Sequence, residues 1–563
     1  MSIYCITPSL WNHVGEFLPL EDGDHSYSTR GMMAKVDLDG GTYATLIAVS
    51  SCNKLLRRIL FDAVFWSIKL GENDERTEEY KDKMKWMLES GSEVLAYARH
   101  VSVYSFLPEA FEVAKECLTR MTSLRKYTHA SWIGIPPIFV PVLLELPNLT
   151  LLLSCIGTVH SFPALDLLSY KLNSLEVQIC QGDIEETDCL DFCARVVRSK
   201  DGTDPGGRAS IPNFRRAVVS HLAKTLAPVA KNIKTLYLDM PPWERDQMDK
   251  NWFEEAVGQA KLLMKNPRFS MPSLTRFFIE DAYLTPSLLK EILAGSPFLT
   301  HLALSPLRKA ELETKMPALP MLKRLNIFAQ ECPKRFPAFY STVLVGASLS
   351  HAYLNGLMPL DLGDLLTSPG VQSAASLVTL EVWFDGDRPL RPYHLEKLAR
   401  LCVNLRDFTI GGARYEGDPP EFFNVLSELP NLMSFTWNHP WDSSAVGASP
   451  LWIHDGKYIR SEAAGSFHIL SCARTSINEE VERRIREDLD GCRPTYVKRF
   501  CAVARAHASL QTLVWNPTAE VSWTWTFFRD GEKLKYRQKA VIDYDRGPEA
   551  RVPQNAVLMT GSM

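Results

Sequence analysis

Few stretches of this sequence combine residue types and spacings that could do chemistry. Gly202–Gly207 is rich in glycine, as phosphate-binding loops are, but it lacks the Lys-Ser/Thr pair that such a loop needs. Asp37–Gly41 begins like a calcium loop, yet Ala48 stands at loop position 12, where a bidentate glutamate is required. Cys189 and Cys193 have no second pair of ligands nearby, which argues against zinc. We therefore predict no catalytic residues, no metal site and no cofactor.

A short phrase, Leu-x-x-Leu-x-Leu or a close variant, returns through the middle of the chain. Its leading leucines are spaced by 25, 23, 27, 28, 28 and 27 residues, at Leu274, Leu299, Leu322, Leu349, Leu377, Leu405 and Leu432. Self-similarity at about 20–29 residues with this core is typical of a leucine-rich-repeat solenoid. The Asn or Cys that usually follows the phrase is absent, so we expect degenerate repeats whose turns are satisfied in another way.

Each phrase predicts a short strand, and the stretches between phrases predict helices. The apolar residues of a phrase alternate, as one buried strand face requires. Tyr393–Asn404 and Pro420–Pro430 have helical spacing, and Thr285-Pro286 is expected to open a helix over Ser287–Leu293. We therefore predict an α/β fold in which strand–helix units stack into an array. An ordinary α/β domain with leucines in its strands is the alternative.

The strand residues between the apolar positions would face away from the helices, and they are the candidates for binding. They are His301, Lys323, Asn326, Phe328, His351, Tyr353, Glu381, Trp383, Arg406, Thr409, Ser434 and Thr436. Aromatic side chains flanked by charges are typical of the residues that dominate protein interfaces. We predict a target-binding surface at Phe328, Tyr353, Trp383 and Arg406. Packing of these side chains against insert loops, or against one another, is an equal alternative.

Less regular phrases extend the array toward the N-terminus. Leu124-x-x-Tyr127, Leu172-x-x-Leu175-x-Val177 and Ile233-x-x-Leu236-x-Leu238 fit it. Near residue 150 two registers fit equally, Leu149-x-x-Leu152 and Leu146-x-x-Leu149-x-Leu151.

On the C-terminal side, Leu510-x-x-Leu513-x-Trp515 is one further phrase. The alternating stretch Trp523–Phe527 predicts a hairpin with a two-residue turn at Asp530-Gly531. That register sets Phe527 opposite Leu534, and the hairpin would cover the last strand edge. The predicted organisation is a helical module at 1–70, a helical linker or cap at 71–122, a solenoid at 123–516 with insertions near 181–230 and 439–508, a hairpin cap at 517–546 and a disordered tail at 547–563.

The first 70 residues hold the other informative stretch. Pro8–Pro19 places Leu10, Val14 and Phe17 on one helical face. A Leu-x-x-Val-Ser segment follows at Leu46–Ser50, and a Phe-Trp-x-Ile-x-Leu segment closes the stretch at Phe65–Leu70. This order resembles an F-box over Pro8–Leu70, with a longer insert than usual between the first two helices. With the repeats, the chain is similar to the degenerate F-box and leucine-rich-repeat proteins of fungi.

The resemblance implies an interaction with a Skp-type adaptor, which in turn meets a cullin scaffold. The residues it implies for that surface are Leu10, Trp11, Val14, Phe17, Leu18, Pro19, Leu46, Val49 and Leu55. The alternative is that these residues form the core of a helical cap that closes the end of the solenoid.

The composition is that of an average soluble globular protein. The chain has 563 residues, is 46% hydrophobic and 23% charged, and carries a formal net charge of −4. This charge argues against nucleic-acid binding through bulk basicity. We expect no membrane span and no secretory signal, so the 12 cysteines are expected to be reduced. We predict a cytoplasmic or nuclear protein.

Three functional hypotheses follow from these observations. The first is a non-enzymatic substrate-recognition subunit of a Skp/cullin/F-box-type ubiquitin ligase, whose repeats bind a target protein. The second is a leucine-rich-repeat scaffold with no ubiquitin-ligase link, in which the N-terminal helices serve only as a cap. The third, an enzyme with an unrecognised site, would need a clustered pocket of perturbed titratable groups.

Overall fold

The structure is a computed structural model, and it describes the chain in segments. The described residues are 67–70, 77–89, 92–104, 110–130, 135–146, 150–153, 164–178, 211–239, 251–280, 282–329, 337–367, 374–384, 390–411, 424–438, 451–454, 457–460, 504, 507, 509–516, 521–530, 533–542 and 557–562. The chain divides into two compact units, Met1–Pro306 (unit 1) and Leu307–Met563 (unit 2). Each unit is described by itself.

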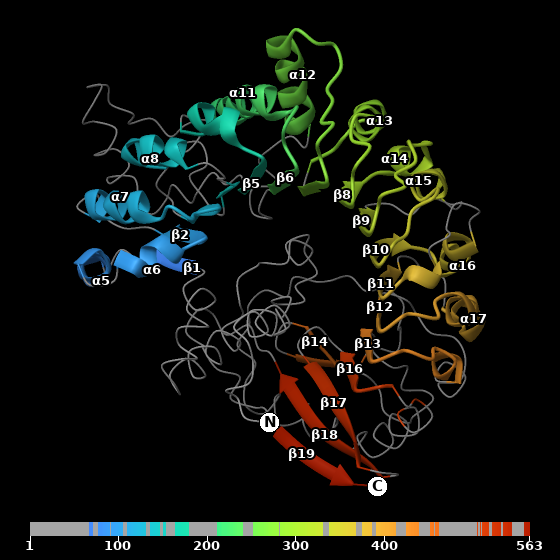
Figure 1. The fold of residues 1–563 in the computed structure, drawn as a ribbon. Coiled ribbons are helices and arrows are strands. Elements are labelled where there is room, and N and C mark those ends of the chain that lie inside the picture. Colours follow the sequence, from blue (N-terminus) through green and yellow to red (C-terminus); the bar gives the residue numbers. More distant parts are fainter. Residues whose placement is uncertain are drawn as a thin grey trace, which may run out of the picture. The chain divides into compact units, whose positions relative to one another are not determined.

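Unit 1 is built from parallel strands, each paired with the next one along the chain (Figure 1). The strands are β1 (Ser67–Leu70), β2 (His100–Tyr104), β3 (Lys126–Ala130), β4 (Thr150–Leu153), β5 (Ser174–Gln178), β6 (Thr235–Asp239), β7 (Arg276–Glu280) and β8 (His301–Leu307). Helices follow the strands along one side: α5 (Thr77–Glu89), α6 (Ser92–Tyr97), α7 (Phe111–Arg120), α8 (Val140–Glu145), α11 (Ile211–Val229), α12 (Trp252–Met264) and α13 (Pro286–Ala294). Two 3-10 turns, η4 (Pro137–Phe139) and η5 (Ser169–Lys171), also lie between the strands, and residues 164–168 are helical directly before η5.

Unit 2 repeats this plan and then changes to antiparallel pairing. The parallel strands are β9 (Arg324–Ala329), β10 (His351–Leu357), β11 (Thr379–Phe384), β12 (Asp407–Gly411), β13 (Ser434–Asn438) and β16 (Thr512–Asn516). The helices are α14 (Lys309–Glu313), α15 (Ala338–Val343), α16 (Pro359–Thr367) and α17 (Pro392–Leu401), with a 3-10 turn, η7 (Ala374–Ser376). Strands β17 (Val521–Asp530), β18 (Lys533–Ile542) and β19 (Val557–Ser562) pair antiparallel after β16. Strands β14 (Leu451–His454) and β15 (Lys457–Arg460) form a separate antiparallel pair.

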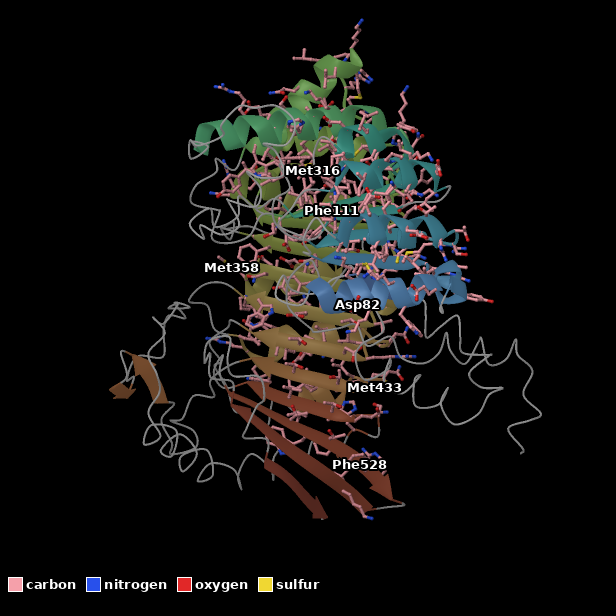
Figure 2. The ribbon with its side chains drawn as sticks, turned by 90° about the vertical axis from the view of Figure 1, so that its left-hand side faces the viewer. Asp82, Phe111, Met316, Met358, Met433 and Phe528 are labelled. Carbon is pink, nitrogen blue, oxygen red and sulfur yellow. The ribbon has the colours of Figure 1, made fainter. Side chains whose placement is uncertain are left out.

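Figure 2 shows the successive strands of unit 2 side by side, followed by the antiparallel strands, where Phe528 is labelled. In the parallel strands whose side-chain burial is described, the apolar residues of the phrase are buried, for example Leu354 on β10 and Leu380 and Val382 on β11. Because side chains alternate along a strand, these residues face the helices and their neighbours face the other way. The leading leucines are buried as well, so the predicted strand–helix repeat is confirmed as the architecture: α/β, mostly parallel and leucine-rich-repeat-like.

The predicted helix starts illustrate why the sequence folds locally as it does. Helix α13 begins at Pro286, and the Oγ1 of Thr285 accepts a hydrogen bond from the backbone N–H of Leu288. This satisfies one of the donors that a helix N-terminus leaves without a partner. Helix α17 begins one residue earlier than Tyr393, at Pro392, which is a favoured first position. Both helices confirm the sequence-based prediction.

Polar side chains in front of the leading leucine replace the usual Asn or Cys of the turn. Asn404 and Asn431 donate from Nδ2 to the carbonyls of Ala375 and Val403 in the preceding repeat, over 2.7 and 2.8 Å. The hydroxyls of Ser273, Ser376 and Ser509 donate likewise to the carbonyls of Lys231, Leu349 and Pro430. Adjacent repeats are therefore joined by a polar ladder located before the strand, whereas the usual Asn or Cys of a leucine-rich repeat follows the strand.

The parallel strands begin earlier than predicted. Where a helical linker was expected at 71–122, β2 lies between β1 and β3, and helices α5 to α7 connect these strands. Alanine and valine occupy the phrase here, as Ala98-x-x-Val101-x-Val103, so a search for leucine does not detect it. Residues Ser67–Leu70, placed at the end of the helical module, form strand β1.

Strand β4 resolves the ambiguity near residue 150 in favour of neither predicted register. Leu151 pairs with Tyr127 on one side and with Leu175 on the other, so Leu151 stands at the fourth position of the phrase. Leu151, Leu152 and Leu153 are consecutive leucines, so the sequence alone does not fix the register. Pairing with the neighbouring strands decides between the registers.

The C-terminal hairpin forms, but its predicted register was wrong by two residues. Asp530 pairs with Lys533, with Gly531 next after Asp530 in the sequence, and Phe527 lies opposite Tyr536 instead of Leu534. A two-residue turn with glycine at its first position matches the twist of the strands, which explains the shift. Strand β17 of the hairpin pairs with β16, which is the last parallel strand. Where a disordered tail was expected, Val557–Ser562 forms β19 against β18.

Two cysteines are described, and both are buried free thiols. Burial raises the pKa of Cys117 and of Cys402 to about 12. No helix in the described segments is long and apolar enough to cross a membrane.

Candidate functional site

The strand face that points away from the helices is the candidate site, and we call it the opposite face. In unit 2, strand pairing arranges its side chains in three rows. The first row is Arg324, His351, Thr379, Asp407, Ser434 and Thr512; the middle row is Asn326, Tyr353, Glu381, Thr409, Thr436 and Val514; the third row is Phe328, Asn355, Trp383, Gly411, Asn438 and Asn516. Most of the middle row is half-buried, from Tyr353 on β10 to Val514 on β16.

The structure brings three of the four predicted target-binding residues together. Phe328 and Trp383 share the third row with Asn355 between them, and Tyr353 lies in the middle row on the intervening strand. Phe328 is 40% exposed, whereas Tyr353 and Trp383 are half-buried. These aromatic side chains therefore occupy adjacent strands of one face.

Arg406 lies elsewhere on the same strands. It immediately precedes β12, and its backbone N–H donates to the carbonyl of Val378. It is five positions from Gly411, which pairs with Trp383, so about 16 Å of strand separates Arg406 from the aromatic group. Arg406 is exposed, at the end of the face where the strands begin.

Glu381 is the chemically distinctive residue of this face, and the sequence did not single it out. Its Oε1 accepts a hydrogen bond of 2.6 Å from the indole Nε1 of Trp383. Burial raises the pKa of the Glu381 carboxyl to about 7, and the hydrogen bond from Trp383 opposes that rise. The one available signal was its place between Leu380 and Val382, which puts a charged side chain in the middle of a face flanked by aromatic residues.

The opposite face of unit 1 differs from that of unit 2. In its middle row, Tyr237, Phe278 and Ala303 pair in register and are buried, at 4%, 0% and 0% exposure. The Tyr237 and Phe278 rings meet edge to face, with 6.1 Å between their centroids. This row is part of the packed interior of the unit.

Unit 1 also carries a glutamate in its middle row. Glu176 on β5 pairs with Tyr237 on β6, and burial raises the pKa of its carboxyl. Lys126 and Arg276 act in the opposite direction and lower that pKa. The chain thus supplies two cations to Glu176, whereas none contributes to the shift of Glu381.

The residues predicted to meet an adaptor lie outside the described residues. These are Leu10, Trp11, Val14, Phe17, Leu18, Pro19, Leu46, Val49 and Leu55. Cys189 and Cys193 also lie outside them, as do Asp37–Gly41 and Gly202–Gly207. Within the described segments, no group of three or more His, Cys, Asp or Glu side chains is placed to hold a metal ion.

Comparisons with known proteins add a similarity to solved structures. No family model matches the chain, and no curated protein matches it. Among solved structures, the chain is similar to one in the crystal structure of the Rad7 and Elc1 complex in yeast. The similarity covers 78% of this chain and 93% of that chain, with 13% sequence identity and a TM-score of 0.36.

Proposed function

We propose that this chain is a non-enzymatic protein-interaction protein that holds a target protein on the opposite face of strands β9–β12. The supporting observation is that Phe328, Tyr353 and Trp383 occupy adjacent strands of one face and that each keeps part of its surface accessible. Large aromatic side chains contribute strongly to binding when a partner desolvates them. Noncovalent recognition is the chemistry that such a surface performs.

The test compares proteins that co-purify with the full chain and with Tyr353→Ala/Trp383→Ala, measured by quantitative mass spectrometry. A matched control is Tyr170→Ala, because Tyr170 is 62% exposed and lies in η5 of unit 1. We expect one set of partners to be lost in the double variant and kept in Tyr170→Ala. Retention of every partner by the folded double variant would contradict the proposal that this face binds a target.

We further propose that the chain is the substrate-recognition subunit of a Skp/cullin/F-box-type ubiquitin ligase. The support is the resemblance of the N-terminal sequence to an F-box. Since Ser67–Leu70 is strand β1, the module that would dock the adaptor ends no later than residue 66. A leucine-rich-repeat scaffold without a ligase link, whose N-terminal helices act only as a cap, is the alternative.

Two variants separate the receptor from the scaffold. A Skp-type adaptor should co-purify with the full chain and be lost in Leu10→Ala/Phe17→Ala, with the target retained. Deletion of 1–66 leaves β1 in place; a receptor should then keep its target and lose its adaptor, whereas a scaffold that has lost its cap should aggregate. Absence of the adaptor from the full chain would contradict the ligase role and leave the interaction role standing.

A further inference from the structure

Glu381 stands among neutral side chains in the middle row of unit 2. In register with it are Tyr353 on β10 and Thr409 on β12, and the flanking residues of its own face on β11 are Thr379 and Trp383. All of these side chains are half-buried. The indole N–H of Trp383 fixes one carboxylate oxygen over 2.6 Å, which orients the Glu381 side chain along the strand.

Among the described residues of β10, β11 and β12, no lysine or arginine acts on the Glu381 carboxyl. On β10 the nearest titratable group is His351, whose Nδ1 lies 2.8 Å from the Oγ of Ser350. On β12 it is Asp407, preceded by the exposed Arg406 at the far end of the strand. Burial raises the pKa of Glu381 to about 7, and no lysine or arginine contributes to its shift. Glu176 lies in the middle row of unit 1, and there Lys126 and Arg276 lower the pKa of its carboxyl.

An ionised, partly desolvated carboxylate without a cation is costly, and a partner that brings one relieves the cost. The face of an indole ring attracts cations, arginine above all, and a tyrosine ring does so more weakly. A bound carboxylate beside such rings therefore favours a cationic side chain over a neutral or anionic one.

We propose that Glu381, Trp383 and Tyr353 form a subsite for one cationic side chain, arginine or lysine, from a basic segment of the target protein. The inference rests on the proposed interaction role, and it specifies the chemistry of the target. A phosphate or nucleic-acid backbone has the wrong sign for this subsite.

Immobilised peptide pools test the subsite without knowledge of the target. Each pool fixes one central residue as arginine, lysine, citrulline or glutamine, and randomises the neighbours among uncharged residues. The full chain and Glu381→Gln are compared on all pools, with folding verified by circular dichroism. We expect the arginine and lysine pools to bind the wild-type chain about tenfold better than the neutral pools. Glu381→Gln should abolish this preference, and the matched control Glu176→Gln should keep it.

A pH series adds a readout that a purely structural role would not produce. The peptides keep their charge between pH 6 and pH 8, while Glu381 ionises with a pKa of about 7. Binding to the arginine pool should therefore rise about tenfold over this range, because only the ionised carboxylate attracts the cation. His351→Gln should retain the rise, and Glu381→Gln should lose it.

Equal binding to cationic and neutral pools, or an unchanged preference in Glu381→Gln, would overturn the subsite. Failure of every pool to bind would overturn it as well. In each case the co-purification experiment with Tyr353→Ala/Trp383→Ala still decides the interaction role independently.

Discussion

The middle rows of the two units show how one repeat pattern produces two different surfaces. In unit 1, Tyr237, Phe278 and Ala303 are buried, so that strands β6–β8 are covered on both faces. In unit 2, Tyr353 and Glu381 are half-buried and partly accessible. The apolar phrase that faces the helices is the same in both units, so it does not decide the difference. The residues between the apolar positions decide it, and they determine which unit can offer a binding face.

The largest expected effect comes from a matched pair of phenylalanines. Phe278→Ala should lower the free energy of unfolding by about 3–4 kcal/mol, since it removes a fully buried ring from a packed row. Phe328→Ala should change it by about 0.5 kcal/mol or less, because Phe328 is 40% exposed. Urea unfolding followed by hydrogen exchange of the full chain measures both. Similar losses in the free energy of unfolding for the two variants would contradict the distinction between the two faces.

The pH dependence of unit 2 should reveal Glu381. Because the folded-state pKa of Glu381 is raised to about 7 from its ordinary value of 4.5, the folded state holds a proton that the unfolded state releases. This contribution to stability is lost as pH rises from about 4.5 to about 7, and it stays lost above that. Glu381→Gln should remove the decline and stabilise β10–β12 at pH 8 by about 1–2 kcal/mol, after allowance for solvent screening. Hydrogen exchange of these strands at pH 5 and pH 8 measures it, and an unchanged slope would refute the assignment.

A double-mutant cycle in unit 1 sharpens the contrast. Lys126→Met should destabilise unit 1 at pH 8 by about 1 kcal/mol, because Lys126 favours the ionised form of Glu176. In the Glu176→Gln background the Lys126→Met substitution should cost almost nothing. Equal costs in the two backgrounds, which mean a coupling energy near zero, would contradict this expectation.

The smallest expected effect concerns the polar ladder that both units share. Asn431→Ala removes the hydrogen bond to the carbonyl of Val403 and should cost about 0.5–1 kcal/mol. Asn232→Ala, an exposed asparagine of unit 1, is the control and should be nearly neutral. If thermal unfolding gives equal shifts for both variants, the ladder does not contribute to the coupling between repeats.

The sequence predicts the array where the phrase is strict and fails where its composition changes. From Leu274 to Leu432 the leucine period alone places every strand, because each leading leucine must be buried. Near Ala98 the same position holds a small residue, and Leu151–Leu153 are consecutive leucines, so that only pairing between strands reveals the register. The hairpin register likewise depends on which two residues the turn takes up.

The candidate site was predictable in its location and only partly in its chemistry. The alternation on β10 and β11 indicates Tyr353 and Trp383 as surface residues. The continuous apolar run Phe277–Ile279 in unit 1 is typical of a strand buried on both faces, and it indicates that unit 1 differs from unit 2. The perturbed pKa of Glu381 depends on burial and on the contact with Trp383, which no sequence pattern expresses.

Hydroxyl-radical footprinting of the full chain tests the central claim most directly. After correction for the intrinsic reactivity of each residue type, we predict that Phe328, Tyr353 and Trp383 are oxidised much faster than Tyr237 and Phe278. That result would leave the opposite face of unit 2 accessible to a target and that of unit 1 buried within the protein. Oxidation of Phe278 and Tyr237 at the rates of Phe328 and Trp383 would contradict the account.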